Sequence, residues 1–136
     1  MSGSRMTAAQ TAALAALVGL AACGGGASPT TPSSPNPGGG TVGATITIGP
    51  NGAVGPAQVT IAVGQSVTFV NNDTRAHDMA SDPHPSHTEC PPLNAAGGLA
   101  PGQSKNTNAF PAVRTCGFHD HSNPGNAALM GRIVIQ

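Results

Sequence analysis

The sequence contains no tryptophan and no tyrosine, and only three phenylalanines among its 136 residues. The core of any fold that this chain adopts must therefore come mainly from Val, Ile, Leu and Ala side chains. Charged residues are also scarce, at 7%, with five Lys or Arg against five Asp or Glu. Because the chain has neither a basic patch nor a polybasic segment, we expect no nucleic acid partner and no electrostatic binding to anionic lipid.

Long hydrophobic runs are missing as well, apart from one near the N-terminus. The run from Ala12 to Ala22 is too short to span a bilayer. With Arg5 ahead of it and small residues before Cys23, it is typical of a secretory signal. The string "LAAC" that ends at Cys23 resembles the bacterial lipobox, which implies that residues 1–22 are a lipoprotein signal peptide and that Cys23 becomes lipidated. The alternative is an ordinary signal peptide that leaves Cys23 as a plain thiol.

The next segment, residues 23–41, is rich in Gly, Pro, Ser and Thr and carries no charge. Such a segment buries too little apolar surface to offset the cost of ordering, so we expect a flexible tether. Residues 42–136 remain as one domain. These features predict an exported protein, lipid-anchored to the periplasmic or outer face of a bacterial membrane, with the lipid as its only membrane contact.

Short strand signals separated by Gly and Pro turns run through the 42–136 domain. "ATITIG" and the segments 59–63 and 67–71 alternate apolar residues, and "GRIVIQ" closes the chain. The segment 75–98 holds four prolines and no periodicity, which predicts a long loop. No window outside the signal has a helical period. The pattern predicts an all-β domain, a Greek-key β-sandwich or barrel of about 6–8 strands.

Histidine and cysteine gather in one part of this domain. All five histidines and both cysteines of the domain lie between positions 77 and 121. These side chains are the preferred protein ligands of zinc and copper, so the zone is a candidate metal site. In an oxidising compartment we expect Cys90 and Cys116 either to pair or to be held by a metal.

Three strings of this domain resemble the plastocyanin-like and azurin-like cupredoxins. "VTIAVGQSVTFVNNDTRAHDM" is similar to the middle of such a domain, a β-hairpin and a strand followed by a histidine. "LAPGQS" and "FPAVRTCGFH" are similar to its later part, where a Pro-Gly turn and a strand lead to Cys-x-x-His. The resemblance covers essentially the whole domain. It implies a cupredoxin fold, one copper ion in a type 1-like site, and transfer of single electrons to an unknown redox partner protein.

The same resemblance implies a set of copper ligands. In the family, a cysteine thiolate and two imidazoles form a near-trigonal site with a weak axial methionine. Carried over, His77 is the first ligand, Cys116 the thiolate and His119 the second imidazole. His121 is an alternate to His119, because its Cys-x4-His spacing is azurin-like.

The axial position departs from the family pattern. The usual order Met-x-Gly is replaced here by "LMG", which puts Leu129 in the expected slot and Met130 directly before Gly131. Met130 is therefore a doubtful axial ligand that we expect to point into the sandwich. The axial position is then filled by Leu129 or by nothing.

A second alternative concerns Cys90. A disulfide between Cys90 and Cys116 would close a loop of about 25 residues and exclude a copper thiolate. The domain would then be a non-redox copper-holding module, or a metal-free binding module stapled by that disulfide.

The string "SDPHPSHTE" also has two interpretations. His84 and His87 belong to a solvated, proline-stiffened loop, or they form a second, weaker metal site or a flap over the copper. The acidic residues of this half are expected to be mostly solvated loop charges; they are Asp73, Asp78, Asp82, Glu89 and Asp120.

No pattern of an enzyme is recognisable. The sequence shows no Ser-His-carboxylate set, no paired carboxylates and no phosphate-binding Gly loop. "GFHDH" is similar to a string of copper-zinc superoxide dismutases, but only Met130 could ligate after His121, so that activity is not expected. We expect an electron carrier or a binding module rather than an enzyme.

Overall fold

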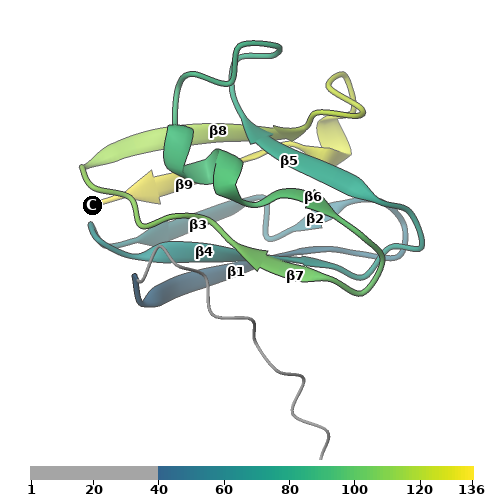
Figure 1. The fold of residues 1–136 in the computed structure, drawn as a ribbon, viewed down its shortest axis with the longest axis horizontal. Helices are drawn as coiled ribbons and strands as arrows, with labels where there is room; N and C mark the ends of the chain where they lie inside the picture. Colours follow the sequence, from purple (N-terminus) through teal and green to yellow (C-terminus); the bar gives the residue numbers. More distant parts are fainter. Residues whose placement is uncertain (1–39) are drawn as a thin grey trace, which may run out of the picture. The chain divides into compact units, whose positions relative to one another are not determined.

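Two β-sheets lie face to face in the computed structural model, which describes residues 40–136 (Figure 1). One sheet has the strand order β2-β1-β4-β7 and the other the order β3-β9-β8-β5-β6. The elements are β1 (Val42–Ile48), β2 (Val54–Gly55), β3 (Gln58–Ile61), β4 (Ser66–Asn71), β5 (His77–Ser81), η1 (Pro91–Ala95), β6 (Gly97–Leu99), β7 (Ser104–Asn106), β8 (Arg114–Asp120), η2 (Ala127–Leu129) and β9 (Gly131–Ile135).

The N-terminal predictions fall outside the described residues. The signal peptide 1–22, the lipidation site Cys23 and nearly all of the tether 23–41 belong to this undescribed part. Residues 40–136 themselves include no helix with the length and apolar character needed to cross a membrane.

Both sheets mix parallel and antiparallel pairs. β1 runs parallel to β4 and β3 runs parallel to β9, whereas β8 pairs antiparallel with β5 and β9. The predicted all-β sandwich is confirmed. The described residues contain nine strands instead of six to eight, and the two-residue β2 is among them.

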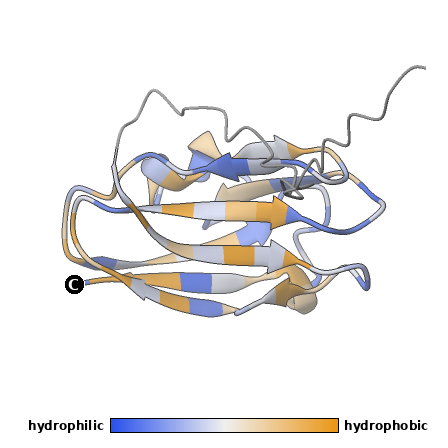
Figure 2. Cartoon of the chain, turned by 90° about the horizontal axis from the view of Figure 1, so that it is seen from below, coloured by the Kyte–Doolittle hydropathy of each residue, from blue (hydrophilic) through white to orange (hydrophobic). Residues whose placement is uncertain are grey.

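The core lies between the sheets and follows the alternation of the strands. In Figure 2 hydrophobic and hydrophilic residues alternate along the strands, because successive side chains point to opposite faces. The aliphatic side chains that the sequence predicted fill this core, together with all three phenylalanines. The rings of Phe69 on β4 and Phe118 on β8 meet edge to face, with centroids 5.3 Å apart, and so join the two sheets.

The segment 75–98 is more ordered than the sequence predicted. The expectation of a loop is wrong for β5, which lies between β8 and β6, and for β6 and η1. β5 reads "HDMAS" and lacks a hydrophobic alternation, yet four of its five residues are buried. Its buried polar residues are hydrogen-bonded, and one partner of His77 is Asp120 on β8, a contact that the local sequence does not reveal.

The pairing of β5 with β8 decides which side chains can meet. Ala80 lies opposite His119, and Met79 lies opposite Asp120. Neighbouring side chains of a strand point to opposite faces. His119 therefore projects from the outer face of the sheet, whereas Asp120 projects into the sandwich.

Candidate metal centre

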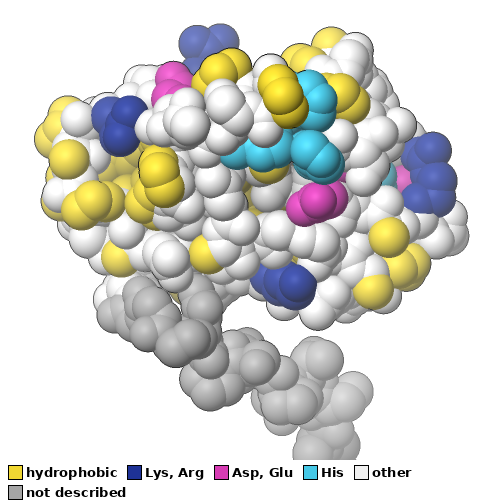
Figure 3. Space-filling model, turned by 45° about the horizontal axis from the view of Figure 1, so that its top comes forward, with side chains coloured by type: hydrophobic (Ala, Val, Ile, Leu, Met, Phe, Trp, Pro, Cys, Tyr) yellow, Lys and Arg dark blue, Asp and Glu magenta, His cyan; other side chains and the backbone are white. Residues whose placement is uncertain are grey.

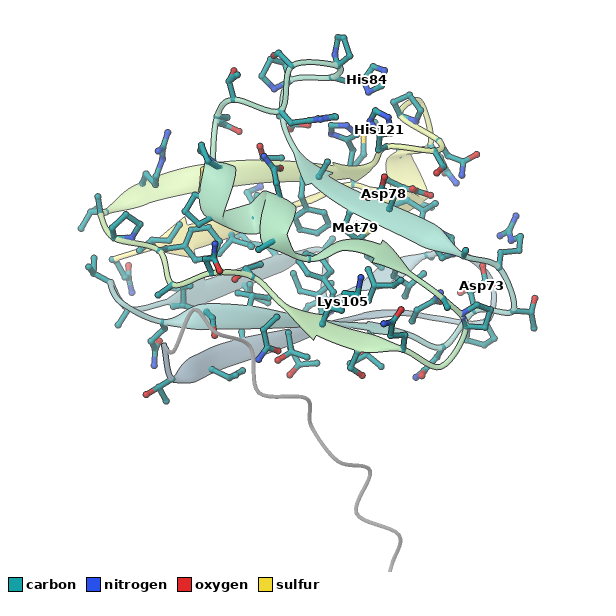
Figure 4. The ribbon with its side chains drawn as sticks, viewed as in Figure 1. Asp73, Asp78, Met79, His84, Lys105 and His121 are labelled. Carbon is teal, nitrogen blue, oxygen red and sulfur yellow. A yellow bond between two sulfur atoms is a disulfide. The ribbon has the colours of Figure 1, made fainter. Side chains whose placement is uncertain are left out.

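Four imidazoles from two segments meet on the outer face of the five-stranded sheet. His84 and His87 come from the loop after β5, His119 comes from the end of β8, and His121 follows it. Each ring offers one nitrogen, and these four atoms all lie within 4.8 Å of one another. Histidine side chains form one patch in Figure 3, and Figure 4 places His84 and His121 on the side of β5 that faces away from the other sheet. We call these four residues the histidine cluster.

His119 is the buried member of the histidine cluster. Its side chain is 2% exposed, and its Nδ1–H donates a 2.6 Å hydrogen bond to Oδ1 of Asp82. Its other nitrogen, Nε2, is buried and has no hydrogen-bond partner among residues 40–136. A buried nitrogen without a partner costs about 1–3 kcal/mol, so native proteins rarely keep one without a reason. This nitrogen is free to act as a ligand.

His87 shows a second sign of functional constraint. Its φ of 49° lies in the left-handed region, which is uncommon for a residue other than glycine. Its Nε2 lies 3.1 Å from Nδ1 of His121, so one of these nitrogens donates to the other. Burial, followed by the neighbouring His121, His119 and His84, lowers the pKa of His87 below its usual 6.5. This favours the neutral imidazole, which is the form that binds metals.

The loop that carries His84 and His87 is fastened to β8. A disulfide joins Cys90 to Cys116. The Asp82 N–H donates to the Gly117 carbonyl at 3.1 Å, and the Gly117 N–H donates to Oε2 of Glu89 at 2.9 Å. Of the alternatives that the sequence left open for these cysteines, the structure contains the disulfide. The sulfur of Cys116 is therefore not available as a copper thiolate in this state.

His77 lies apart from the histidine cluster, on the inner side of the same sheet. Its Nε2 is 3.0 Å from Oδ2 of Asp73, and its Nδ1 is 3.0 Å from Oδ2 of Asp120. A carboxylate only accepts hydrogen bonds, so a ring nitrogen of His77 that carries a hydrogen donates it to the carboxylate it faces. We call these three residues the His77 triad; Figure 4 shows Asp73 at the end of the sandwich.

The two carboxylates of the His77 triad are both buried, although the sequence suggested solvated loop charges. The hydrogen bond from His77 is the main cause that lowers the pKa of Asp73 from 3.8 to about 2. Burial acts to raise the pKa of Asp120, but hydrogen bonds from Asn123, the Asp78 N–H and His77 outweigh it and lower that pKa. Both carboxyl groups therefore remain anions beside His77 at a lower pH than an ordinary aspartate would.

The structure does not bring together the predicted ligands His77, Cys116 and His119. His77 has both nitrogens occupied by carboxylates, and Cys116 is in the disulfide. Cys116 and His119 are three residues apart on one strand, which places their side chains on opposite faces of the sheet. His121, the predicted alternate, does lie beside His119 in the histidine cluster.

The predicted axial position also differs. Leu129 is 1% exposed and belongs to the core, whereas Met130 is partly exposed. The expectation that Met130 points into the sandwich is therefore wrong. Met130 instead lines an open pocket of about 880 Å³ together with Asp82 and Glu89.

The cluster members that the ligand prediction omitted are His84 and His87. The sequence does carry a signal for them, because two closely spaced histidine pairs, His84 with His87 and His119 with His121, lie in the same zone. The resemblance to a Cys-x-x-His copper loop implies Cys116 as a ligand instead. Only the contact between the loop and β8 shows that the two pairs meet.

Comparison with known proteins agrees with this architecture. No family model matches the sequence, and no curated protein matches it. A purple cupredoxin from Nitrosopumilus maritimus and an oxidised plastocyanin from Dryopteris crassirhizoma are each 19% identical, with a TM-score of 0.53 over 68% of this chain and 99% of theirs. A Cu-containing nitrite reductase from Thermus scotoductus is 18% identical, with a TM-score of 0.56 over 70% of this chain and 22% of its own. Residues 40–136 therefore have the cupredoxin fold that the sequence resemblance predicted.

Proposed function

We propose that this protein holds one copper ion on an extracytoplasmic face, through imidazoles of His84, His87, His119 and His121. The observation that carries the proposal is the buried, unpartnered Nε2 of His119 inside a group of four imidazoles. A ligand at this nitrogen would remove the cost of leaving it unsatisfied.

The donor set fits copper better than other first-row ions. Imidazole nitrogens suit copper, zinc and nickel, and among divalent ions of the series copper binds a given nitrogen site most tightly. No thiolate takes part, so the bound ion would lack the intense blue colour of a copper thiolate. This is the copper-holding alternative that the sequence analysis left open.

The competing proposal is a single-electron carrier with a type 1-like site and a redox partner protein. The cupredoxin fold favours it, and several structural neighbours are cupredoxins. The disulfide at Cys116 and the two carboxylates on His77 speak against it. Copper-holding is therefore the function that these residues support best.

Copper titration of the purified full chain tests the proposal. We expect one Cu(II) per chain, an electron paramagnetic resonance spectrum with several nitrogen couplings, and no blue band. His119→Ala should lower the affinity by at least about 100-fold, because even loss of a supporting residue costs 10–100-fold. Equal copper affinity in His119→Ala would contradict the proposal. A blue band that appears with Cu(II) after reduction of the disulfide would favour the electron carrier instead.

His77 supplies a control within the same molecule. The chain contains five histidines, and four of them form the histidine cluster. When Zn²⁺ is added as a diamagnetic substitute, the imidazole NMR signals of the four cluster residues should shift and those of His77 should not. A shift confined to His77 and one neighbour would point to the predicted type 1 ligands.

We also propose that the chain is exported and anchored by a lipid on Cys23. The support is the string "LAAC" behind an apolar segment, followed by a stretch rich in Gly, Pro and Ser. Cys23→Ala should release the protein from the membrane fraction. Continued membrane association of this variant would contradict the lipid anchor.

A further inference from the structure

We infer that Asp82 is the positioning residue of this site: its carboxylate holds His119 with the hydrogen on Nδ1 and leaves Nε2 free for the metal. The inference rests on the proposed function, because it names what prepares the buried ligand. Asp82 touches no other ring of the histidine cluster in the contacts described for residues 40–136.

The contact between Asp82 and His119 is short, and it joins a buried imidazole to a partly exposed carboxylate. Oδ1 of Asp82 lies 2.6 Å from Nδ1 of His119, within the range of charge-assisted hydrogen bonds. The histidine side chain is 2% exposed and the aspartate side chain is 47% exposed. The imidazole is thus shielded from water, and the carboxylate is its one hydrogen-bond partner within residues 40–136.

Gly117 makes room for this carboxylate. A Cβ atom at position 117 would overlap Oδ2 of Asp82 and lie 3.3 Å from Oε2 of Glu89. Gly117 and His119 are two residues apart on β8, so both face outward. The strand therefore presents an open space for the carboxylate beside the imidazole that it binds.

The backbone of Asp82 is tied to the same strand. Its N–H donates to the Gly117 carbonyl at 3.1 Å, and its own carbonyl accepts from the Glu89 N–H at 2.8 Å. The position of the carboxylate relative to His119 is thus set by β8 and by the base of the loop at Glu89, not by the exposed end of the loop.

This arrangement has a chemical consequence for the ligand nitrogen. A neutral imidazole carries one hydrogen, and an acceptor at Nδ1 keeps that hydrogen away from Nε2. Carboxylates that accept from a ligand histidine also raise its basicity, and their loss typically lowers metal affinity 10–100-fold. In the Cys-Gly-Phe-His string, Gly117 therefore leaves space for the Asp82 carboxylate and His119 supplies the ligand nitrogen. Cys116 fastens the loop through its disulfide.

The first experiment measures the tautomer of His119 without metal. In ¹⁵N NMR spectra of the full chain in detergent, we expect the wild-type ring to carry its hydrogen on Nδ1. In Asp82→Ala a detectable fraction should move to Nε2, and Gly117→Ala should act in the same direction because it displaces the carboxylate. An Nε2–H tautomer in the wild-type protein would overturn the inference.

The second experiment measures Cu(II) affinity of the same variants by competition with a chelator. Asp82→Ala should bind 10–100-fold more weakly. Asp82→Asn should lose less, because its amide oxygen still accepts from Nδ1. The matched control is Glu89→Gln, which alters the other carboxylate fastened to Gly117 but touches no imidazole.

The outcomes separate this inference from the proposed function. If Glu89→Gln weakens copper binding as much as Asp82→Ala does, Asp82 merely holds the loop and the inference is overturned. If copper binding in Asp82→Ala equals that of the wild type, the inference fails while the proposed function stands. If the wild-type protein binds no copper, the proposed function fails, and the tautomer measurement still decides whether Asp82 orients His119.

Discussion

The histidines on the two faces of the β5–β8 strand pair have opposite environments. On the inner face, His77 is buried between two carboxylates and both of its nitrogens are occupied. On the outer face, His119 is equally buried, but a single carboxylate holds one nitrogen and the other has no partner in the described part of the chain. Burial and a nearby aspartate are common to both rings. The difference is the number of carboxylates: two occupy both nitrogens of His77, whereas one leaves Nε2 of His119 available.

Removal of His77 should have the largest effect on stability. Loss of one partner from a buried ionic group typically costs 3–5 kcal/mol, because the remaining charges are left uncompensated. We therefore expect the free energy of unfolding of His77→Ala to fall by about 3–5 kcal/mol in urea titrations. His77→Gln, which keeps a donor for one carboxylate, should lose less and serves if His77→Ala does not fold.

The same variants test the comparison between the two faces. The copper affinity of folded His77→Gln should equal that of the wild type, because His77 does not belong to the histidine cluster. Weaker copper binding by this variant, measured where it is fully folded, would show that the inner face contributes to the metal site.

The disulfide should have the next largest effect, and it should act on both stability and copper binding. It joins residues 26 apart, and removing such a crosslink costs about 3.5 kcal/mol in the chain-entropy model. It also fastens the loop of His84 and His87 to the strand of His119. Replacement of both Cys90 and Cys116 by Ala should therefore lower the unfolding free energy and weaken copper binding, as measured by urea titration and chelator competition.

The two effects of the disulfide can be distinguished. The tautomer of His119 should be preserved in folded molecules, because Asp82 stays hydrogen-bonded to Gly117. Unchanged copper affinity in the folded double variant would contradict a role for the disulfide in presenting the loop histidines.

Acid should reduce the stability that the His77 triad gives to the domain. The pKa of Asp73 is lowered to about 2 in the folded state. A lowered folded-state pKa stabilises the fold above the unfolded-state value near 4, and this contribution is lost as the pH falls toward 2. We expect the unfolding free energy to decrease between about pH 4 and pH 2, with a smaller decrease in Asp73→Asn. An identical pH dependence of the unfolding free energy in the wild type and in Asp73→Asn would contradict the lowered pKa of Asp73.

Much of the fold follows from the sequence because the strands carry their own signal. The alternation of apolar residues in β1, β3, β4 and β9 predicts strands with one face in the core. β5 lacks this signal because buried polar groups replace hydrophobic ones, and one partner of His77, Asp120, lies far along the chain. A window of local sequence holds no information on such partners.

The metal site is harder to predict because it depends on where a strand ends. The sequence indicates the zone of histidines and cysteines, and it allows the disulfide as one of two alternatives. A copper ligand set with Cys116 and His119 requires the chain to leave the strand between them, but β8 continues to Asp120. An odd spacing within a strand then separates the two side chains. Nothing in "FHDH" shows that the strand continues, since its pairing with β5 depends on residues distant in sequence.

The exposed member of the histidine cluster should give the smallest effect. His84 lies on the loop, is exposed, and has no hydrogen bond among those described, whereas His119 is buried and oriented. Fixing an exposed side chain costs rotamer entropy, so its net contribution to binding is smaller. His84→Ala should therefore weaken Cu(II) binding by about 10-fold, or about 1.4 kcal/mol. Chelator competition measures this, with Ser86→Ala on the same loop as the matched control. If His84→Ala lowers the copper affinity as much as His119→Ala does, the oriented Nε2 of His119 contributes no more to binding than an exposed ring, which would contradict this prediction.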